Sequence, residues 1–389
     1  MNIIRVLNIK MVVFIVLLIN SNIFYAQQTA TLKEIEIQSK ILNQGRPIYL
    51  YLPAEYDERN LVSFDVIYVF DAQDRETFDL VHSALNFVSL KKKFIVVGVS
   101  SPAYEDLEYY RNYDYLPKPI NVSLKNYNTD KPNAENFWKY FSEEIMPFVN
   151  KNYRTTNDIY LVGHSLSASF VFDKAIHSPD LFKGFICVSP NLSYDQNRLA
   201  NDFLKINFNK PSENKFLFIS QADEYISFGK TWGEAYNKVR KFIKKSENLG
   251  KYNISIREYP KLNHRATVLP SISDALHSLH DFIAKNPYTQ NGESKEVTFK
   301  ITVQNKNHEA FISGNQESLG NWNPSKVKLN YISEFEREIK LKVKFPLEFK
   351  ITKGDWESEV YTDQTTNSGE NIVINKIEKD IISLTITQW

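Results

Sequence analysis

The sequence predicts an α/β fold with helices on both faces of a sheet, followed by a small all-β sandwich domain. Between about residues 30 and 285, continuous apolar runs, which suit strands buried on both faces, alternate with stretches of helical periodicity. Beyond a polar, turn-rich stretch, apolar and polar residues alternate, which is the period of a sandwich with one solvated face. At 389 residues and 42% hydrophobic content, the chain is long enough for two domains.

The predicted elements follow one another along the chain in that order. Helical spacing of apolar residues is clearest before residue 150, at Phe137, Tyr140, Phe141, Ile145 and Phe148. The strands predicted in the first domain are 48–53, 64–70, 94–100, 159–163, 182–189, 216–220 and 254–260. We place the domain boundaries as follows: a signal peptide at 1–26, an α/β domain at 27–285, a linker at 286–295 and a β-sandwich domain at 296–389.

The N-terminal segment has the pattern of a secretory signal. Arg5 and Lys10 precede the apolar run "MVVFIVLLI", which is too short to span a bilayer, and small Ala26 marks the expected cleavage site. We therefore expect a secreted or periplasmic protein with no membrane span.

Charge and cysteine content exclude several function classes. The formal net charge is +1, and loss of Arg5 and Lys10 with the signal would make it −1, so no basic stripe attracts nucleic acid. The single cysteine, Cys187, lies in an apolar strand and is predicted to be an inert core thiol. CxxC and HExxH patterns are absent, so we expect no metal of those kinds and no cofactor.

The stretch "IYLVGHSLSASFVF" (159–172) contains the candidate nucleophile, Ser165. A strand, Gly163, Ser165 and a helical stretch follow one another, as in the strand-to-helix turn that presents the nucleophile of α/β-hydrolases. Ser167 stands where G-x-S-x-G has its last glycine, and we expect so small a residue to be tolerated there. The alternative is an ordinary buried serine at a strand end.

The order serine, acid, histidine along such a fold selects the partners. Among the histidines after Ser165, only His264 occupies a loop directly after a strand, so it is the predicted base. The acid should follow the preceding strand, where Asp223 and Glu224 are adjacent; we favour Asp223, with Glu224 as the alternative. The oxyanion would be bound by the N–H groups of Leu166 and Gln73.

The chain also resembles a known family. The motifs "RPIYLYLPAEYD", "DVIYVFDAQD", "FIVVGVSS", "IYLVGHSLSA", "FKGFICVSPNLSYD" and "NHRATVLPSISDAL" resemble, in order and spacing, the esterase D-like family of putative esterases, which includes feruloyl, acetyl xylan and siderophore esterases. The resemblance implies an α/β-hydrolase fold with Ser165, Asp223 and His264 as the triad. Ala72 stands where that family commonly has glycine.

The C-terminal stretches "FISGNQESLGNWNPSKVKL" and "FPLEFKITKGDWESE" resemble the starch-binding domain, the family 20 carbohydrate-binding module. That resemblance implies a sugar platform made by Trp322 and Trp356, with Lys350 and Glu357 as polar partners. Indole faces stack on pyranose rings, which fits this role. The alternative is that either tryptophan belongs to the sandwich core.

Together these features predict a secreted serine esterase that acts, through an acyl-enzyme, on an ester borne by a carbohydrate or carbohydrate-like molecule. Its partners would be that ester and a glycan, possibly an α-glucan, at the C-terminal domain. One alternative is a siderophore trilactone esterase, with a cationic pocket for an anionic chelate. Another is a catalytically silent glycan-binding protein.

Overall fold

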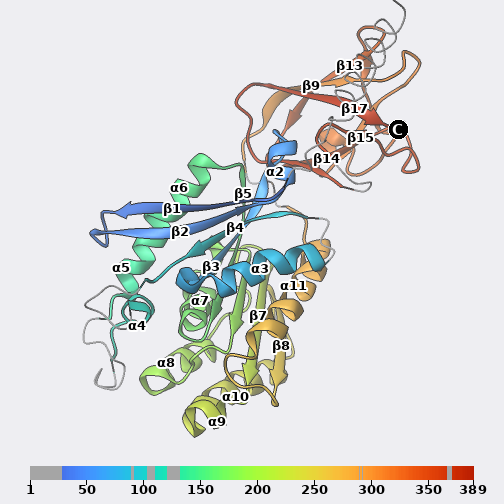
Figure 1. Ribbon diagram of the computed structural model, residues 1–389. Helices are drawn as coiled ribbons and strands as arrows, with labels where there is room; N and C mark the ends of the chain where they lie inside the picture. Colours follow the sequence, from blue (N-terminus) through green and yellow to red (C-terminus); the bar gives the residue numbers. More distant parts are fainter. Residues whose placement is uncertain are drawn as a thin grey trace, which may run out of the picture.

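The computed structural model describes residues 29–88, 92–102, 110–120, 132–288, 290, 292–365 and 370–389. The predicted signal peptide lies outside these residues. The described chain forms an α/β domain (29–288) and a β domain (292–389), with the β domain at one end of the central sheet (Figure 1).

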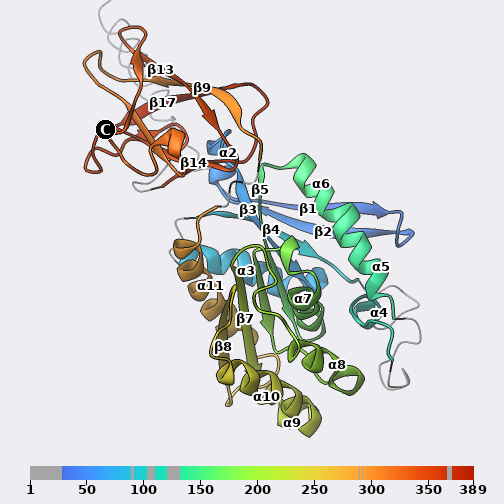
Figure 2. The ribbon, with the colours of Figure 1, turned by 180° about the vertical axis from the view of Figure 1, so that it is seen from behind.

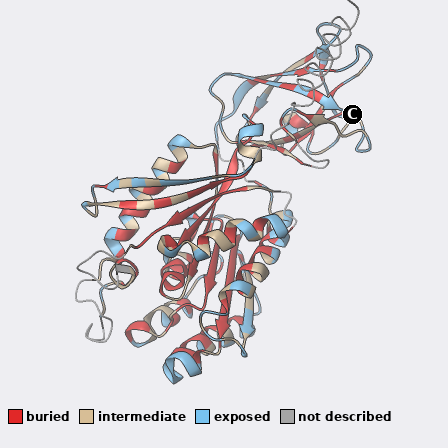
Figure 3. Cartoon of the chain, in the orientation of Figure 1, coloured by how far each residue is buried: buried red, intermediate tan, exposed pale blue. Residues whose placement is uncertain are grey.

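The centre of the α/β domain is an eight-stranded sheet in the order β1-β2-β4-β3-β5-β6-β7-β8. The first two strands pair antiparallel with each other, β2 also pairs antiparallel with β4, and all other pairs are parallel. Strands β3, β4, β6 and β7 are buried along their whole length, whereas β1 is largely exposed (Figure 3). The bounds are β1 (Thr31–Ser39), β2 (Gln44–Leu52), β3 (Phe64–Phe70), β4 (Phe94–Val99), β5 (Thr155–His164), β6 (Gly184–Val188), β7 (Lys215–Ala222) and β8 (Tyr252–Tyr259).

Helices cover both faces of this sheet (Figures 1 and 2). Helices α3 (Glu76–Phe87) and α11 (Val268–Lys285) bury their apolar residues on one face. The other face carries α5 (Ala134–Lys139), the π-helical turn η3 (Tyr140–Ile145), α6 (Met146–Asn152), α7 (Leu166–His177), α8 (Tyr194–Phe203) and α10 (Lys230–Lys245). Shorter helices are α2 (Glu55–Glu58), η1 (Ala72–Asp74), α4 (Tyr110–Tyr115), η4 (Pro179–Leu181) and α9 (Glu224–Phe228).

The π-helical turn changes which residues of the predicted helical run face the core. The first four predicted core residues, through Ile145, are fully buried, but Val149 rather than Phe148 is buried after the turn. One extra residue per turn in η3 shifts the buried face by one position. Because proline cannot continue a regular α-helical ladder, Pro147 at the start of α6 fits this local widening.

The β domain consists of two sheets, one in the order β11-β10-β14-β16 and the other β12-β13-β9-β17-β15. Alternate residues point inward, as in β17, where Ile382, Leu384 and Ile386 are buried between exposed neighbours. The bounds are β9 (Lys295–Thr302), β10 (Phe311–Gly314), η5 (Glu317–Leu319), β11 (Val327–Lys328), β12 (Asn330–Tyr331), β13 (Glu336–Val343), β14 (Leu347–Thr352), β15 (Tyr361–Thr362), β16 (Ile372–Ile374) and β17 (Ile381–Gln388).

The predicted fold class is confirmed: an α/β sheet with helices on both faces is followed by a sheet-rich domain. Strand β1 was not predicted, because its sequence "TLKEIEIQS" lies at the exposed edge of the sheet and lacks a continuous apolar run. Cys187 is fully buried in β6, and burial raises the pKa of its thiol. Across the described ranges, no helix has both the length and the apolar character required to cross a membrane.

Candidate active site

Ser165 occupies a sharp turn between β5 and α7. Its backbone angles, φ 60° and ψ −118°, lie outside the regions that residues other than glycine normally adopt. Two hydrogen bonds fix the turn: Ser165 N donates to Val188 O (2.9 Å), and Ser169 N donates to Ser165 O (3.1 Å). This is the strained strand-to-helix geometry that presents a nucleophile at the carboxyl edge of a sheet.

The residues on either side of Ser165 explain why the turn can form. A Cβ atom on Gly163 would lie 2.5 Å from the carbonyl carbon of Ser167, so only glycine fits there. Ser167 is fully buried, and its hydroxyl donates to His164 O (2.9 Å) and accepts from His164 N (3.0 Å). Serine in place of the usual glycine is therefore accommodated, because its one polar atom is satisfied within the turn.

His264 pairs with Glu224, not with the favoured Asp223. The Nδ1 atom of His264 lies 2.9 Å and 3.0 Å from the two carboxylate oxygens of Glu224, whose side chain is fully buried. Asp223 is half-buried and occupies the N-cap position of α9, with its N–H donating to Leu262 O (3.1 Å). The preference for Asp223 is thus corrected: α9 begins directly after β7, and this turn directs the second acid, rather than the first, toward the imidazole.

The other ring nitrogen of His264 is available for proton transfer. Nε2 is buried and makes no hydrogen bond with any part of the chain that the structure describes. The ring is packed edge-on against Phe228 (centroids 4.7 Å apart) and Trp232 (5.6 Å), two rings that stack on each other. Aromatic packing and the Glu224 contact together fix the orientation of the imidazole.

His164, directly before Ser165, also contacts His264. Its Nε2 lies 3.1 Å from the His264 carbonyl oxygen, and the two ring centroids are 4.7 Å apart. Burial, followed by the proximity of His264, lowers the pKa of His164 to about 4. His164 is therefore neutral at neutral pH and links the strand before the nucleophile to the loop that carries the base.

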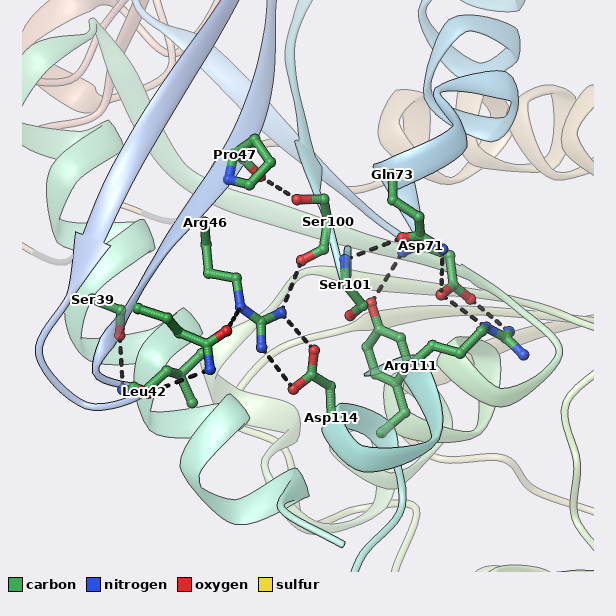
Figure 4. Close-up of polar contacts among 12 residues, drawn as sticks. Ser39, Leu42, Arg46, Pro47, Asp71, Gln73, Ser100, Ser101, Arg111 and Asp114 are labelled. Atoms are coloured by element: carbon green, nitrogen blue, oxygen red, sulfur yellow. Dashed lines mark hydrogen bonds and ion pairs between the residues drawn. The ribbon is translucent and has the colours of Figure 1, made fainter. Parts of the chain in front are cut away.

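The loop after β3 supplies the second predicted oxyanion donor. Gln73 is in the short helix η1, and Leu166 is the first residue of α7; N–H groups at such helix starts have no acceptor within the helix. Gln73 is held by its side chain, whose Oε1 accepts from Ser101 N (3.1 Å) (Figure 4). Ala72, where the resembled family commonly has glycine, is fully buried.

Asp71 ties this loop to α4. Its N–H donates to the Tyr115 hydroxyl (3.1 Å), and its carboxylate accepts from Arg111 Nε (3.1 Å) and Nη2 (2.7 Å) (Figure 4). Burial alone would raise the pKa of Asp71, but the Arg111 guanidinium outweighs it, and the pKa is lowered. Asp71 therefore stays charged and holds Arg111 at the site. The sequence analysis assigned no role to Arg111.

A second ion pair supports α4 from behind. Arg46 of β2 donates to both carboxylate oxygens of Asp114 (2.7 Å and 3.1 Å), and both side chains are fully buried. Figure 4 shows the two pairs, Arg46 with Asp114 and Arg111 with Asp71, on either side of the chain segment at Ser100 and Ser101. The loop after β3 is thus connected through α4 to the antiparallel edge of the sheet.

These groups surround one cavity, which we call the catalytic cavity. Its volume is about 820 Å³, and it lies at the carboxyl ends of the parallel strands. Its charged lining residues are largely paired: Arg111 with Asp71, and Arg265 with Glu76 (2.5 Å). The lining includes Asp71, Gln73, Arg111, His164, Ser165, Phe228, His264 and Arg265. No group of three or more metal-ligating side chains occurs in the described residues.

The predicted sugar-binding residues of the β domain have different surroundings. Trp322 is half-buried and faces the α/β domain, whereas Trp356 is 42% exposed and, within the described chain, makes no ring contact with it. Lys350 Nζ pairs with Glu359 Oε1 (2.6 Å), and Glu357 is exposed. The single platform implied by the resemblance stays a prediction.

Fold and site together define a hydrolase of the α/β-hydrolase type. The chain belongs to the putative esterase family, whose family model matches residues 39–257. The starch binding domain model matches residues 294–377. The protein is therefore an esterase-family chain with a starch-binding module.

Individual relatives are distant. Uncharacterized protein YjcH of Bacillus subtilis is 26% identical over 171 residues, covering 42% of this chain and 64% of that protein. Ferri-bacillibactin esterase BesA of the same organism is 20% identical over 170 residues, covering 40% and 57%. The chain thus spans less than two thirds of the length of these curated relatives.

Solved structures show the same fold. An IroE-like serine hydrolase from Shewanella oneidensis superposes with a TM-score of 0.54 at 21% identity, covering 64% of this chain and 80% of that one. Siderophore hydrolase EstB from Aspergillus nidulans superposes with a TM-score of 0.53 at 16% identity, covering 66% and 97%.

Proposed function

We propose that this protein is a secreted or periplasmic serine esterase that cleaves carboxylic esters on a carbohydrate or carbohydrate-like substrate. The observation that carries the proposal is the strained Ser165 turn in the same cavity as His264. The Nδ1 atom of His264 is held by buried Glu224, and its Nε2 has no hydrogen-bond partner among the described residues. We further propose the domain division given above, with the starch-binding module binding a glycan.

The proposed reaction uses residues of the α/β domain only. The Ser165 hydroxyl oxygen attacks the ester carbonyl carbon while His264 Nε2 accepts its proton. The N–H groups of Gln73 and Leu166 stabilise the oxyanion of the tetrahedral intermediate. Collapse releases the alcohol, which takes the proton from His264, and leaves an acyl-enzyme that water cleaves by the same steps.

Glu224 has a defined part in this scheme. Its carboxylate accepts the Nδ1–H of His264, which keeps Nε2 as the unprotonated, basic nitrogen and stabilises the imidazolium that forms. Full burial of the carboxylate, with the imidazole as its partner, makes this contact strong.

A fluorophosphonate probe tests the proposal. Such a probe forms a covalent bond only with an activated serine, so we expect stoichiometric labelling of Ser165, located by peptide mapping. Ser165→Ala and His264→Ala should both prevent labelling, whereas Ser169→Ala, on the first turn of the same helix, should keep it. Absence of labelling in folded wild-type protein would instead support a catalytically silent glycan-binding protein.

A siderophore trilactone esterase is the second candidate, because two solved structures of similar fold are named siderophore hydrolases. Charge in the catalytic cavity favours the carbohydrate ester: the described cationic residues that line it, Arg111 and Arg265, are each paired with a carboxylate. A panel of feruloyl, acetyl and short p-nitrophenyl esters with a catecholate trilactone separates the two. Preferred turnover of the trilactone would reverse the choice.

A further inference from the structure

A second cavity lies between the two domains, and we call it the interdomain cavity. Its volume is about 370 Å³, which is within the range of about 300–1,000 Å³ typical of small-molecule sites. The α/β domain contributes the start of β3, the segment at Lys92 and Lys93, and the end of α11; the β domain contributes Trp322 and Glu348.

The walls of this cavity are fixed relative to each other. Arg59 and Glu370 form a nearly buried ion pair across the domain contact (2.7 Å). Two hydrogen bonds add to it: Ser63 N donates to Val373 O (2.8 Å), and the side chain of Asn375 donates through Nδ2 to Thr155 O (3.0 Å). One contiguous cluster of buried apolar side chains extends from the α/β domain into the β domain. A ligand would therefore meet a preformed site with two walls.

The positive charges of the cavity are compensated by carboxylates. Its cationic residues are each paired with a carboxylate: Lys92 with Asp65 (2.5 Å), Lys93 with Glu55 (3.2 Å) and Arg59 with Glu370 (2.7 Å). A phosphate or another anion would have to compete with these carboxylates. An uncharged ligand would not have to compete with them for the cationic side chains.

Two groups of the β domain provide apolar and polar contacts in this cavity. Trp322 offers an indole, a surface on which a pyranose ring can stack. Glu348 accepts a hydrogen bond from Asn371 Nδ2 (2.6 Å), and it has no ion-pair partner among the described residues. The remaining lone pairs of its carboxylate can accept hydrogen bonds from hydroxyl groups.

We propose that the interdomain cavity is a composite saccharide-binding site, in which a neutral oligosaccharide stacks on Trp322, donates hydroxyl groups to Glu348 and contacts the end of α11. This inference rests on the proposed glycan binding of the starch-binding module. It goes beyond that function because the α/β domain forms one wall, so glycan binding depends on both domains.

A substitution on the α/β side tests the composite site without altering the β domain. Ala284, an exposed residue near the end of α11, lines the cavity, and Ala284→Trp should fill it. Lys285→Trp is the matched control, because Lys285 is the next residue, is also exposed and does not line the cavity. Both variants are made in the full chain.

The measurement is calorimetric titration with maltoheptaose, with ester turnover measured on a small p-nitrophenyl ester. We expect Ala284→Trp and Trp322→Ala to weaken binding at least about tenfold, or 1.4 kcal/mol. Lys285→Trp should bind like the wild type, and both Ala284→Trp and Lys285→Trp should keep turnover.

The outcomes separate this inference from the proposed function. Wild-type binding by Ala284→Trp, or equal weakening in Lys285→Trp, would overturn the composite site while glycan binding stands. A wild-type chain that neither binds maltoheptaose nor is retained on amylose or xylan would remove the glycan-binding function and this site with it. Ester turnover, measured in parallel, reports on the catalytic proposal independently.

Discussion

The catalytic cavity and the interdomain cavity lie at opposite ends of the same strands. Strand β5 begins at Thr155, which Asn375 of the β domain contacts, and ends at His164, directly before Ser165. Its ten residues, at about 3.3 Å each, place roughly 30 Å between the two ends. A glycan in the interdomain cavity would hold a polymer near the enzyme without positioning the ester bond that reacts.

The two cavities also differ in how their polar groups are used. In the catalytic cavity, the backbone at Ser165 is strained, and Nε2 of His264 has no hydrogen-bond partner within the described chain. In the interdomain cavity, the lysines and Arg59 already have partners, and an indole lies beside them. The first arrangement suits bond cleavage, and the second suits binding. Changes at one end should therefore leave the other intact.

The largest expected effect is that of the nucleophile. Ser165→Ala should lower ester turnover by a factor on the order of 10⁶, because removing one member disables a triad that acts as a unit. Binding of maltoheptaose by the same variant should stay at the wild-type level, as measured by calorimetry. Substantial residual turnover, after exclusion of contaminating esterases, would contradict the assignment of Ser165.

The next effect separates two adjacent acids. Glu224→Gln should lower kcat by about 10⁴, since the amide no longer holds the Nδ1–H tautomer of His264. Asp223→Asn is the matched control and should have a far smaller effect, because Asp223 precedes α9 at its N-cap position and does not contact the imidazole. Steady-state kinetics on one small ester decide the ranking, and the reverse order would return the role to Asp223.

A third effect concerns stability at acidic pH. Burial lowers the pKa of His164 to about 4 from an ordinary 6.5, so the unfolded chain binds a proton between these values that the folded chain does not. The resulting stability is fully present above pH 6.5 and is lost as pH falls toward 4, by at most about 3 kcal/mol. His164→Gln keeps a donor for the His264 carbonyl but cannot titrate.

Urea unfolding at several pH values between 6.5 and 4 measures this difference. The wild type should lose more stability than His164→Gln over this window. Asp158, at the other end of β5, has the opposite influence, because burial raises its pKa to about 7 and its contribution is lost as pH rises. Comparing the two proteins removes that common background. Parallel pH profiles would show that His164 is not the titrating group.

Much of the catalytic cavity could be predicted from local sequence patterns, but the choice of acid could not. Strand, Gly163, Ser165 and helix are consecutive, so the turn is encoded within a short stretch of sequence. Asp223 and Glu224 are equally suited by type and position. Which one reaches His264 depends on the backbone angles where β7 passes into α9. The last residue of α9, Phe228, packs against Trp232 and the His264 ring, and the contact with His264 joins residues that are distant in sequence.

The interdomain cavity is harder to predict because no single segment encodes it. The sequence identified Trp322 as a candidate sugar-binding residue. Its place in a cavity that the end of α11 also lines depends on contacts between residues far apart in sequence, such as Asn375 with Thr155, 220 positions away. The linker prediction likewise missed that Tyr288 is buried, with its hydroxyl donating to Asp65 Oδ1 (2.7 Å). A polar, turn-rich composition indicates where a chain changes direction. It does not indicate whether residues of that segment are buried or hydrogen-bonded to a domain.

The smallest expected effect tests whether the domain contact is part of the folded structure. Asn375→Ala removes the hydrogen bond to Thr155 O at the start of β5, and we expect it to lower the free energy of unfolding by about 1 kcal/mol. Asn307→Ala, an exposed position of the same domain, should stay within about 0.5 kcal/mol of the wild type. Urea unfolding of the full chain, followed by fluorescence and circular dichroism, measures both.

Because the apolar core is continuous between the domains, the wild type should unfold in one transition, and Asn375→Ala should shift that transition as a whole. Two separate transitions, with only the β domain affected, would mean that the domains fold independently, and the composite cavity would then lose the rigid contact on which it depends.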